Sequence, residues 1–134
     1  MRPIDQSSIE PGAGNSLAAC LASILEMPIE EVPDFQMGQD VDGLDSFLDQ
    51  KGLAGAWLIG DLSLFLIRPF CQEHVVIIGP SPRNPSRWHA VVGACRAKED
   101  ALEIVHDPHP SRAGLLDPFV GALLIFPRSA LKLK

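Results

Sequence analysis

The chain has 134 residues, of which 46% are hydrophobic and 21% are charged, and its formal net charge at pH 7 is −6. This length suits one domain with a core of its own, so we expect residues 1–134 to form a single domain. An acidic chain without clustered Lys and Arg has no general attraction for phosphate backbones or anionic lipid, which argues against nucleic-acid and membrane partners.

The cysteines and the first residues indicate the compartment. Cys20, Cys71 and Cys95 cannot all pair within the chain, and none shows C-x-x-C spacing, so we expect reduced and mostly buried thiols. The N-terminal residues lack the charged-then-apolar pattern of a secretion signal, and apolar runs such as 120–126 are too short to span a bilayer. These features predict a cytoplasmic protein.

Helix signals occupy the first part of the chain. Ser16 opens a stretch with apolar residues at helical spacing, which predicts an amphipathic helix with a polar cap, ending near Met27. A short helical turn is expected at 28–32. Asp42 is expected to cap a second helix that ends at Gly52.

After Gly52 the apolar runs become short and rich in Val and Ile, which is typical of strands. Helices followed by strands predict an α+β domain in which the N-terminal helices pack on an antiparallel β-sheet. We place strands at residues 74–78, 88–95, 102–107 and 120–126, with a weaker signal at 56–59.

Two of these strands bring a histidine and an acid together. The polar loop 96–100 joins them, and a hairpin around it pairs Cys95 with Ala101. The same register sets His89 directly opposite Asp107, at the distance of side chains that share a face. Asp107 could then fix the imidazole tautomer and stabilise its cation, although an incidental polar pair at a sheet end is the alternative.

A nucleophile candidate stands at the head of the first helix. Side chains there gain from the helix dipole and from unpaired N–H groups, which lower the pKa of a nucleophile and help to hold an oxyanion. Ser16 has this position, and Gln6 could donate its side-chain amide to the same oxyanion. Taken alone, Gly-Asn-Ser before a helix is only a capping signal.

The ordered set is more specific than its parts. Gln6, the run 14–20, the run 89–93 and Asp107-Pro108 resemble the papain-like cysteine hydrolases of the bacteriocin-processing (double-glycine) peptidase type. That family carries a Gln, a Gly-(Asn/Asp)-Cys motif opening a helix, a His followed by small and β-branched residues, and Asp-Pro on the next strand. The resemblance implies a papain-like fold and a Cys-His-Asp triad that hydrolyses peptide, isopeptide or related acyl bonds of a peptide or protein substrate, without a cofactor.

The chain departs from this pattern at the nucleophile, where the family's cysteine is replaced by Ser16. A hydroxyl is far harder to ionise than a thiol, so we expect the chain to be inactive or very weak as a hydrolase. Three explanations stay open: an engineered replacement, a natural inactive relative that only binds a peptide or protein tail, and a true serine hydrolase. Cys20 is no substitute, because it lies one turn inside the helix on its apolar stripe.

Residues near the triad are candidates for substrate binding. A Pro-rich loop beside the strand of His89 could form a wall for recognition, with a solvated surface loop as the equal alternative. The candidate contacts are Asn15, Ser81, Arg83 and Trp88. Cleavage preference and oligomeric state are not fixed by the sequence.

The run from His106 to His109 could suggest a metal, since His and Asp are ligands for zinc or iron. Pro108 and the alternation of side chains along a strand scatter these groups, and alternation turns His106 away from the face of Asp107. We therefore predict no metal site.

Overall fold

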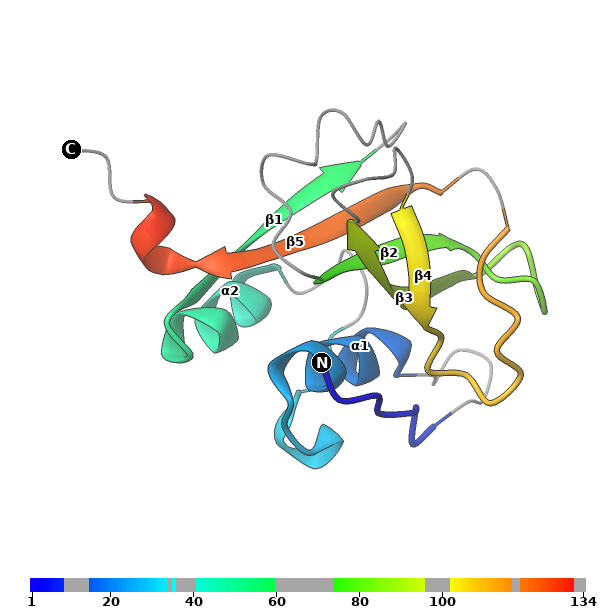
Figure 1. Cartoon of the computed structure of the whole chain (residues 1–134), viewed down its shortest axis with the longest axis horizontal. Helices are drawn as coiled ribbons and strands as arrows, with labels where there is room; N and C mark the ends of the chain where they lie inside the picture. The colour runs from blue at the N-terminus through cyan, green and yellow to red at the C-terminus, as the bar shows by residue number, and fades with distance from the viewer. Residues whose placement is uncertain are drawn as a thin grey trace.

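The structure is a computed structural model of the chain, and it describes residues 1–8, 15–33, 35, 41–59, 74–95, 102–116 and 119–131. Within these ranges two α-helices precede an antiparallel sheet of five strands, which confirms the predicted α+β class (Figure 1). The helical elements are α1 (Ser16–Leu25), η1 (Ile29–Glu31), α2 (Val41–Gln50) and the C-terminal η3 (Arg128–Leu131). The strands are β1 (Leu53–Ile59), β2 (His74–Pro80), β3 (Trp88–Cys95), β4 (Leu102–His106) and β5 (Gly121–Pro127).

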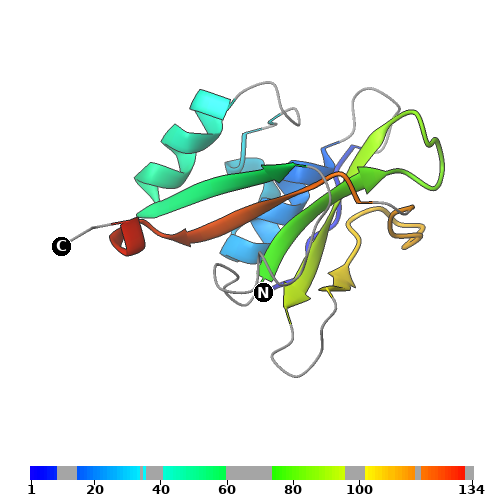
Figure 2. The same ribbon diagram turned by 90° about the horizontal axis from the view of Figure 1, so that it is seen from above.

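The strands are ordered β1-β5-β2-β3-β4, and every neighbouring pair is antiparallel. The last strand in sequence, β5, therefore lies between β1 and β2 (Figure 2). This order places β3, which carries His89, next to the edge strand β4.

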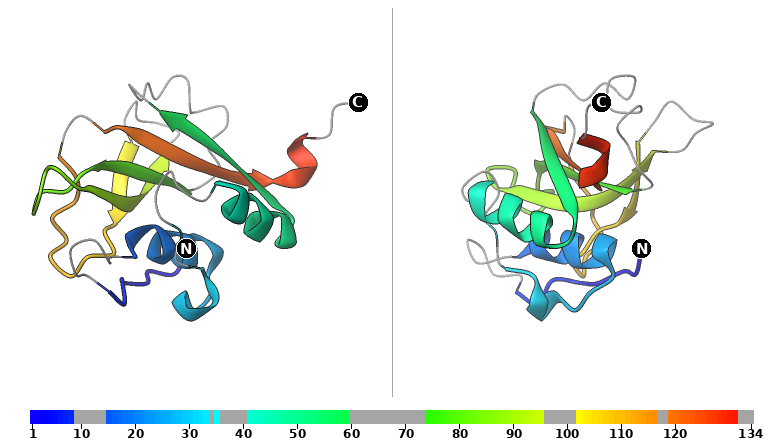
Figure 3. Two further views of the ribbon diagram at one scale, coloured as in Figure 1. Left: turned by 180° about the vertical axis from the view of Figure 1, so that it is seen from behind. Right: turned by 90° about the vertical axis from the view of Figure 1, so that its left-hand side faces the viewer.

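Both helices cover the same face of the sheet (Figure 3). All residues of α1 from Ser16 to Ser23 are buried, and the helix packs chiefly on β3. Alanines at positions 18, 19 and 22 are buried and present little side-chain volume. The helix face of the sheet contributes Val76, Ile78, Ala90, Val92 and Leu123 to one core cluster. The opposite face contributes Val75, Ile77, Val91, Ala122 and Leu124 to a second.

Several element ends differ from the sequence prediction. Helix α1 ends at Leu25 rather than near Met27, because Glu26 adopts a left-handed conformation (φ 55°) and its N–H bonds to a carbonyl in the last turn. Asn15 has the N-cap position, but its side chain makes no capping hydrogen bond, so the predicted polar cap is wrong. Asp42 lies in the first turn of α2 rather than at its cap.

The predicted register of β3 and β4 is also wrong. Cys95 pairs with Leu102 instead of Ala101. A β-bulge then shifts the pairing, because Gly93 is opposite residue 104 while Val92 is opposite residue 106. The register is thus displaced by one residue near the loop and by two beyond the bulge.

No helix in the described ranges has the length and apolar character needed to cross a bilayer.

Candidate active site

His89 and Asp107 form a buried pair at one end of β3. Nε2 of the imidazole lies 2.7 Å from Oδ1 of the carboxylate, and the two side chains are only 5% and 4% exposed. His89 is the second residue of β3, and Asp107 follows the last residue of β4. The contact expected from the sequence is therefore present, although the two residues are not directly opposite.

The bulge explains how this contact forms. In an unbroken ladder continuing from the loop, Asp107 would stand opposite Ala90, whose side chain faces α1. The extra residue, Val105, has no partner in β3, so the phase of the following residues is reversed. Asp107 directly follows the last pair of this ladder, His106 with Val92, and its carboxylate reaches the ring of His89.

The turn after β4 wraps around the carboxylate of Asp107. Oδ1 also accepts the backbone N–H of His109 at 2.9 Å, and Oδ2 accepts that of Gly114 at 2.7 Å. Arg112, in a left-handed conformation (φ 54°), helps the chain to turn back on itself. Its guanidinium also donates to the backbone carbonyl of Asp107.

These contacts set the ionisation of Asp107. Burial alone raises its pKa, but the hydrogen bonds from the His89 ring and from the N–H groups of His109 and Gly114 outweigh burial and bring the pKa down to about 2. Asp107 is therefore an anion at neutral pH, so Nε2 of His89 carries the proton and donates it to this contact.

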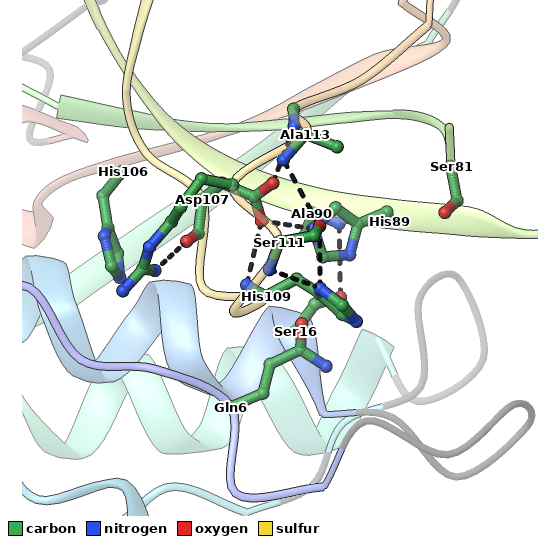
Figure 4. A network of polar contacts seen from close by, with 12 residues as sticks. Gln6, Ser16, Ser81, His89, Ala90, His106, Asp107, His109, Ser111 and Ala113 are labelled. Atoms are coloured by element: carbon green, nitrogen blue, oxygen red, sulfur yellow. Dashed lines mark hydrogen bonds and ion pairs between the residues drawn. The ribbon is translucent and has the colours of Figure 1, made fainter. Parts of the chain in front are cut away.

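Ser16 points from the head of α1 to β3 (Figure 4). Its Oγ accepts the N–H of Ala90, the residue after His89, at 3.2 Å, although the two residues are 74 positions apart. Ser16 is only 6% exposed. The first hydrogen bond within α1 runs from Ala19 to Asn15, so the N–H groups of residues 16–18 precede it. Both the Ala90 N–H and the helix terminus favour negative charge on the side-chain atom of residue 16.

Gln6 lies near these residues, but its amide is oriented differently from our expectation. Its backbone N–H donates to the carbonyl of Pro108 at 3.0 Å, which ties the N-terminal segment to the turn after β4. Its side-chain Nε2 donates to the carbonyl of Ser8 at 3.0 Å, while its buried Oε1 has no partner. In this conformation one N–H of the amide is taken by Ser8, so only the other N–H could donate to an oxyanion.

Asn15, a predicted substrate contact, fastens the N-terminal segment. Its Oδ1 accepts the N–H of Ser8 at 3.1 Å, and its Nδ2 donates to Oγ of Ser7 at 2.8 Å. These bonds use the amide that was expected to cap α1, which is the physical reason for the missing cap.

The loop between β2 and β3 holds the other predicted contacts. Ser81 is buried, and its Oγ accepts the N–H of Arg83 at 3.2 Å, so it shapes the loop from within. Nη1 of Arg83 donates to Oγ of Ser111 at 2.9 Å. Trp88 is 56% exposed and is the neighbour of His89 in sequence, so it is available for contact with another molecule.

From the sequence, His109 was a candidate only for metal binding. The structure places it next to His89. Its ring stands edge-on to the ring of His89, with 6.2 Å between the centroids and 83° between the planes. No group of three or more His, Cys, Asp or Glu in the described part of the chain is arranged to hold a metal ion. A tight turn after Asp-Pro was the one sequence signal that could have pointed to this residue.

Cys20 lies within α1 and is fully buried. Burial raises the pKa of its thiol well above the ordinary value, and the charge of Asp107 adds to the effect. A buried, protonated thiol is a poor nucleophile, so Cys20 does not take the place of Ser16.

Comparison of the chain with protein-family models, with curated proteins and with solved structures found no match.

Proposed function

We propose that this chain has the catalytic arrangement of a papain-like acyl hydrolase. Ser16 has the position of the nucleophile, His89 is the general base, and Asp107 is the acid that orients His89. One observation carries the proposal: a buried His89–Asp107 contact of 2.7 Å, with Oγ of Ser16 bonded at 3.2 Å to the N–H that follows His89. The order of these residues along the chain resembles the double-glycine peptidases, which favours peptide or isopeptide bonds of a peptide or protein as the target.

The proposed chemistry assigns one role to each nitrogen of His89. Nε2 is engaged by Asp107, so Nδ1 exchanges the proton with residue 16. The nucleophile forms a bond to the acyl carbon, the carbonyl electrons move to oxygen, and His89 gives the proton to the leaving group as the acyl bond breaks. Water then releases the acyl group by the reverse sequence. Asp107 stays ionised throughout, because its pKa is about 2.

The identity of residue 16 decides the rate. An imidazole can hold the proton of a thiol whose pKa has been lowered at a helix N-terminus, whereas the proton of an alcohol is much harder to remove. The same surroundings therefore suit a thiolate better than an alkoxide. We expect the chain with Ser16 to be a very weak hydrolase and its Ser16→Cys variant to be the reactive form.

The test uses the Ser16→Cys variant and a thiol-directed acyloxymethyl ketone probe. We expect labelling at residue 16, located by peptide mapping because Cys20, Cys71 and Cys95 are also present. Adding His89→Ala should slow this labelling by on the order of 100-fold, the typical contribution of a general base.

Circular dichroism establishes that each variant is folded. If the folded Ser16→Cys protein labels residue 16 at the same rate with and without His89, the hydrolase proposal is wrong. The remaining hypothesis is then a catalytically silent module that binds a peptide or protein tail. A fluorophosphonate probe reacts only with an activated serine. It would therefore label the unaltered chain only if the chain is a true serine hydrolase.

A further inference from the structure

His109 is attached to the site by its backbone and held in place by its ring. Its N–H donates to Oδ1 of Asp107, the same oxygen that contacts His89. The ring stands 6.2 Å from that of His89, and in Figure 4 it points from the turn to the head of α1, where Ser16 lies. His109 is therefore held beside His89, the proposed general base.

The contacts of the His109 ring define its tautomer. Nδ1 accepts the backbone N–H of Ser111 at 3.0 Å, and Oγ of Ser111 lies 2.9 Å from the same nitrogen. A nitrogen that accepts a backbone N–H has its lone pair in that bond, so the neutral ring carries its proton on Nε2. Nε2 is then the donor that His109 can offer to another molecule.

Arg83 reinforces this arrangement from the neighbouring loop. Its Nη1 donates to Oγ of Ser111 at 2.9 Å, which leaves the hydroxyl proton of Ser111 free to point at Nδ1 of His109. Burial lowers the pKa of His109, and the positive charge of Arg83 lowers it further. The ring thus stays neutral near pH 7 and cannot take up a proton at Nδ1 without losing the bond from Ser111.

We propose that the Nε2–H of His109 donates a hydrogen bond to the carbonyl oxygen of the acyl group attacked at residue 16. This inference rests on the proposed function. A neutral imidazole whose second nitrogen is occupied donates but does not shuttle protons, which is how an imidazole polarises a carbonyl. Gln6 leaves room for this role, because one of its two amide N–H groups is taken by the carbonyl of Ser8.

In the proposed step, each bond that forms is matched by one that breaks. A bond forms between the side-chain atom of residue 16 and the acyl carbon, and the π electrons of the carbonyl move to its oxygen. That oxyanion accepts the Nε2–H of His109, and no proton leaves His109. When the carbonyl re-forms, the electron pair returns and the leaving group departs with the proton held by His89.

Two matched substitutions test this role in the Ser16→Cys background. His109→Gln places an amide N–H near the position of Nε2, whereas His109→Asn can accept the Ser111 N–H but is too short to place a donor there. The probe is acetyl-glycyl-glycinal, whose aldehyde forms a hemithioacetal with the thiol. We expect its inhibition constant to rise by on the order of 100-fold in His109→Asn and by only a few-fold in His109→Gln.

Iodoacetamide is the control reagent, since it alkylates the thiolate without creating an oxyanion. Its rate at residue 16 should be the same in all three proteins. Equal aldehyde affinity in His109→Asn and in the parent, with both proteins folded, would overturn the proposal. An imidazole ¹⁵N spectrum that places the His109 proton on Nδ1 would overturn it as well. A failure of the hydrolase proposal is distinguishable from this result. In that case the rate of alkylation at residue 16 would be the same with and without His89, in proteins that keep His109.

Discussion

Asp107 contributes both to the stability of the fold and to the candidate site. Its carboxylate receives hydrogen bonds from a strand side chain and from two backbone N–H groups of the following turn. Protonation of Asp107 would remove the charge that all three donors face. The same group therefore links the ionisation of the site to the stability of the protein.

The folded-state pKa of Asp107, about 2, is lower than the ordinary value of 3.8, so this group stabilises the folded chain above about pH 4. That stabilisation, roughly 2 kcal/mol, is lost as the pH falls from about 4 to 2. Asp107→Asn should lower the free energy of unfolding at pH 7 by a similar amount, because its amide cannot accept from all three donors.

Urea unfolding at a series of pH values measures both effects. The difference between the parent and Asp107→Asn should shrink as the pH falls below 4. A difference that stays constant down to pH 2 would contradict the assigned ionisation.

At the scale of elements, the bulge in β4 determines the face on which Asp107 lies. Gly93 stands at the point where the register shifts. A Cβ atom at this position would lie 2.3 Å from Cδ1 and 3.0 Å from Cγ1 of Ile77, which is fully buried. Glycine is thus required here so that the side chain of Ile77 can pack over β3 at this position.

Gly93→Ala should destabilise the fold by roughly 1–3 kcal/mol through overpacking against Ile77. Ile77→Val removes the closest methyl group, so it should recover part of this loss in the double variant. Urea unfolding of the four proteins in the cycle gives the coupling energy, which we expect to be at least about 0.5 kcal/mol. Strict additivity would show that Ile77 is not the obstacle.

Much of this architecture was predictable because it depends on residue type and spacing. The apolar stripe from Leu17 onward predicted the helix α1, and the runs of Val and Ile predicted the strands. The register was not predictable, since neither the sequence of residues 96–100 nor that around the bulge at Val105 has a distinctive residue signature. The predicted and observed registers differ by two positions beyond the bulge, which preserves the face, and so His89 still meets Asp107.

The part played by His109 could not be found by the same means. It depends on Ser111 and on Arg83, which comes from a loop 28 residues before that serine. Such contacts follow from the packing of two loops and not from a local pattern. The orientation of the Gln6 amide is hidden for the same reason, since it depends on the path of the backbone at Ser8.

At the scale of the whole molecule, the N-terminal segment 1–8 holds distant elements together. The N–H of Ile4 donates to Oγ of Ser23 in α1, and its carbonyl is 2.8 Å from Nε2 of His106 in β4. Asp5 binds the guanidinium of Arg112 through both carboxylate oxygens, at 2.6 and 2.8 Å. The segment therefore ties the helix that carries Ser16 to the turn that surrounds Asp107.

Asp5→Asn should loosen this connection, because the charge that Arg112 contacts is removed. We expect the backbone N–H of Gln6, which donates to the carbonyl of Pro108, to exchange with deuterium a few-fold faster. The effect is small because the ion pair that is lost is exposed. Hydrogen exchange read by NMR measures this rate. Glu26→Gln is the matched control, since it removes only the weaker contact of 3.7 Å with the N-terminal amine. The same acceleration in both variants would contradict a specific role for Asp5.

A ribosome makes β5 after the other four strands, yet β5 belongs in the middle of the sheet. Until residues 121–127 emerge, β1 has no partner among the described strands, and one edge of β2 exposes unpaired backbone groups to other nascent chains. Translation products that stop before residue 121 would therefore be the aggregation-prone species of this protein, and the sheet is completed only after residues 121–127 have been made.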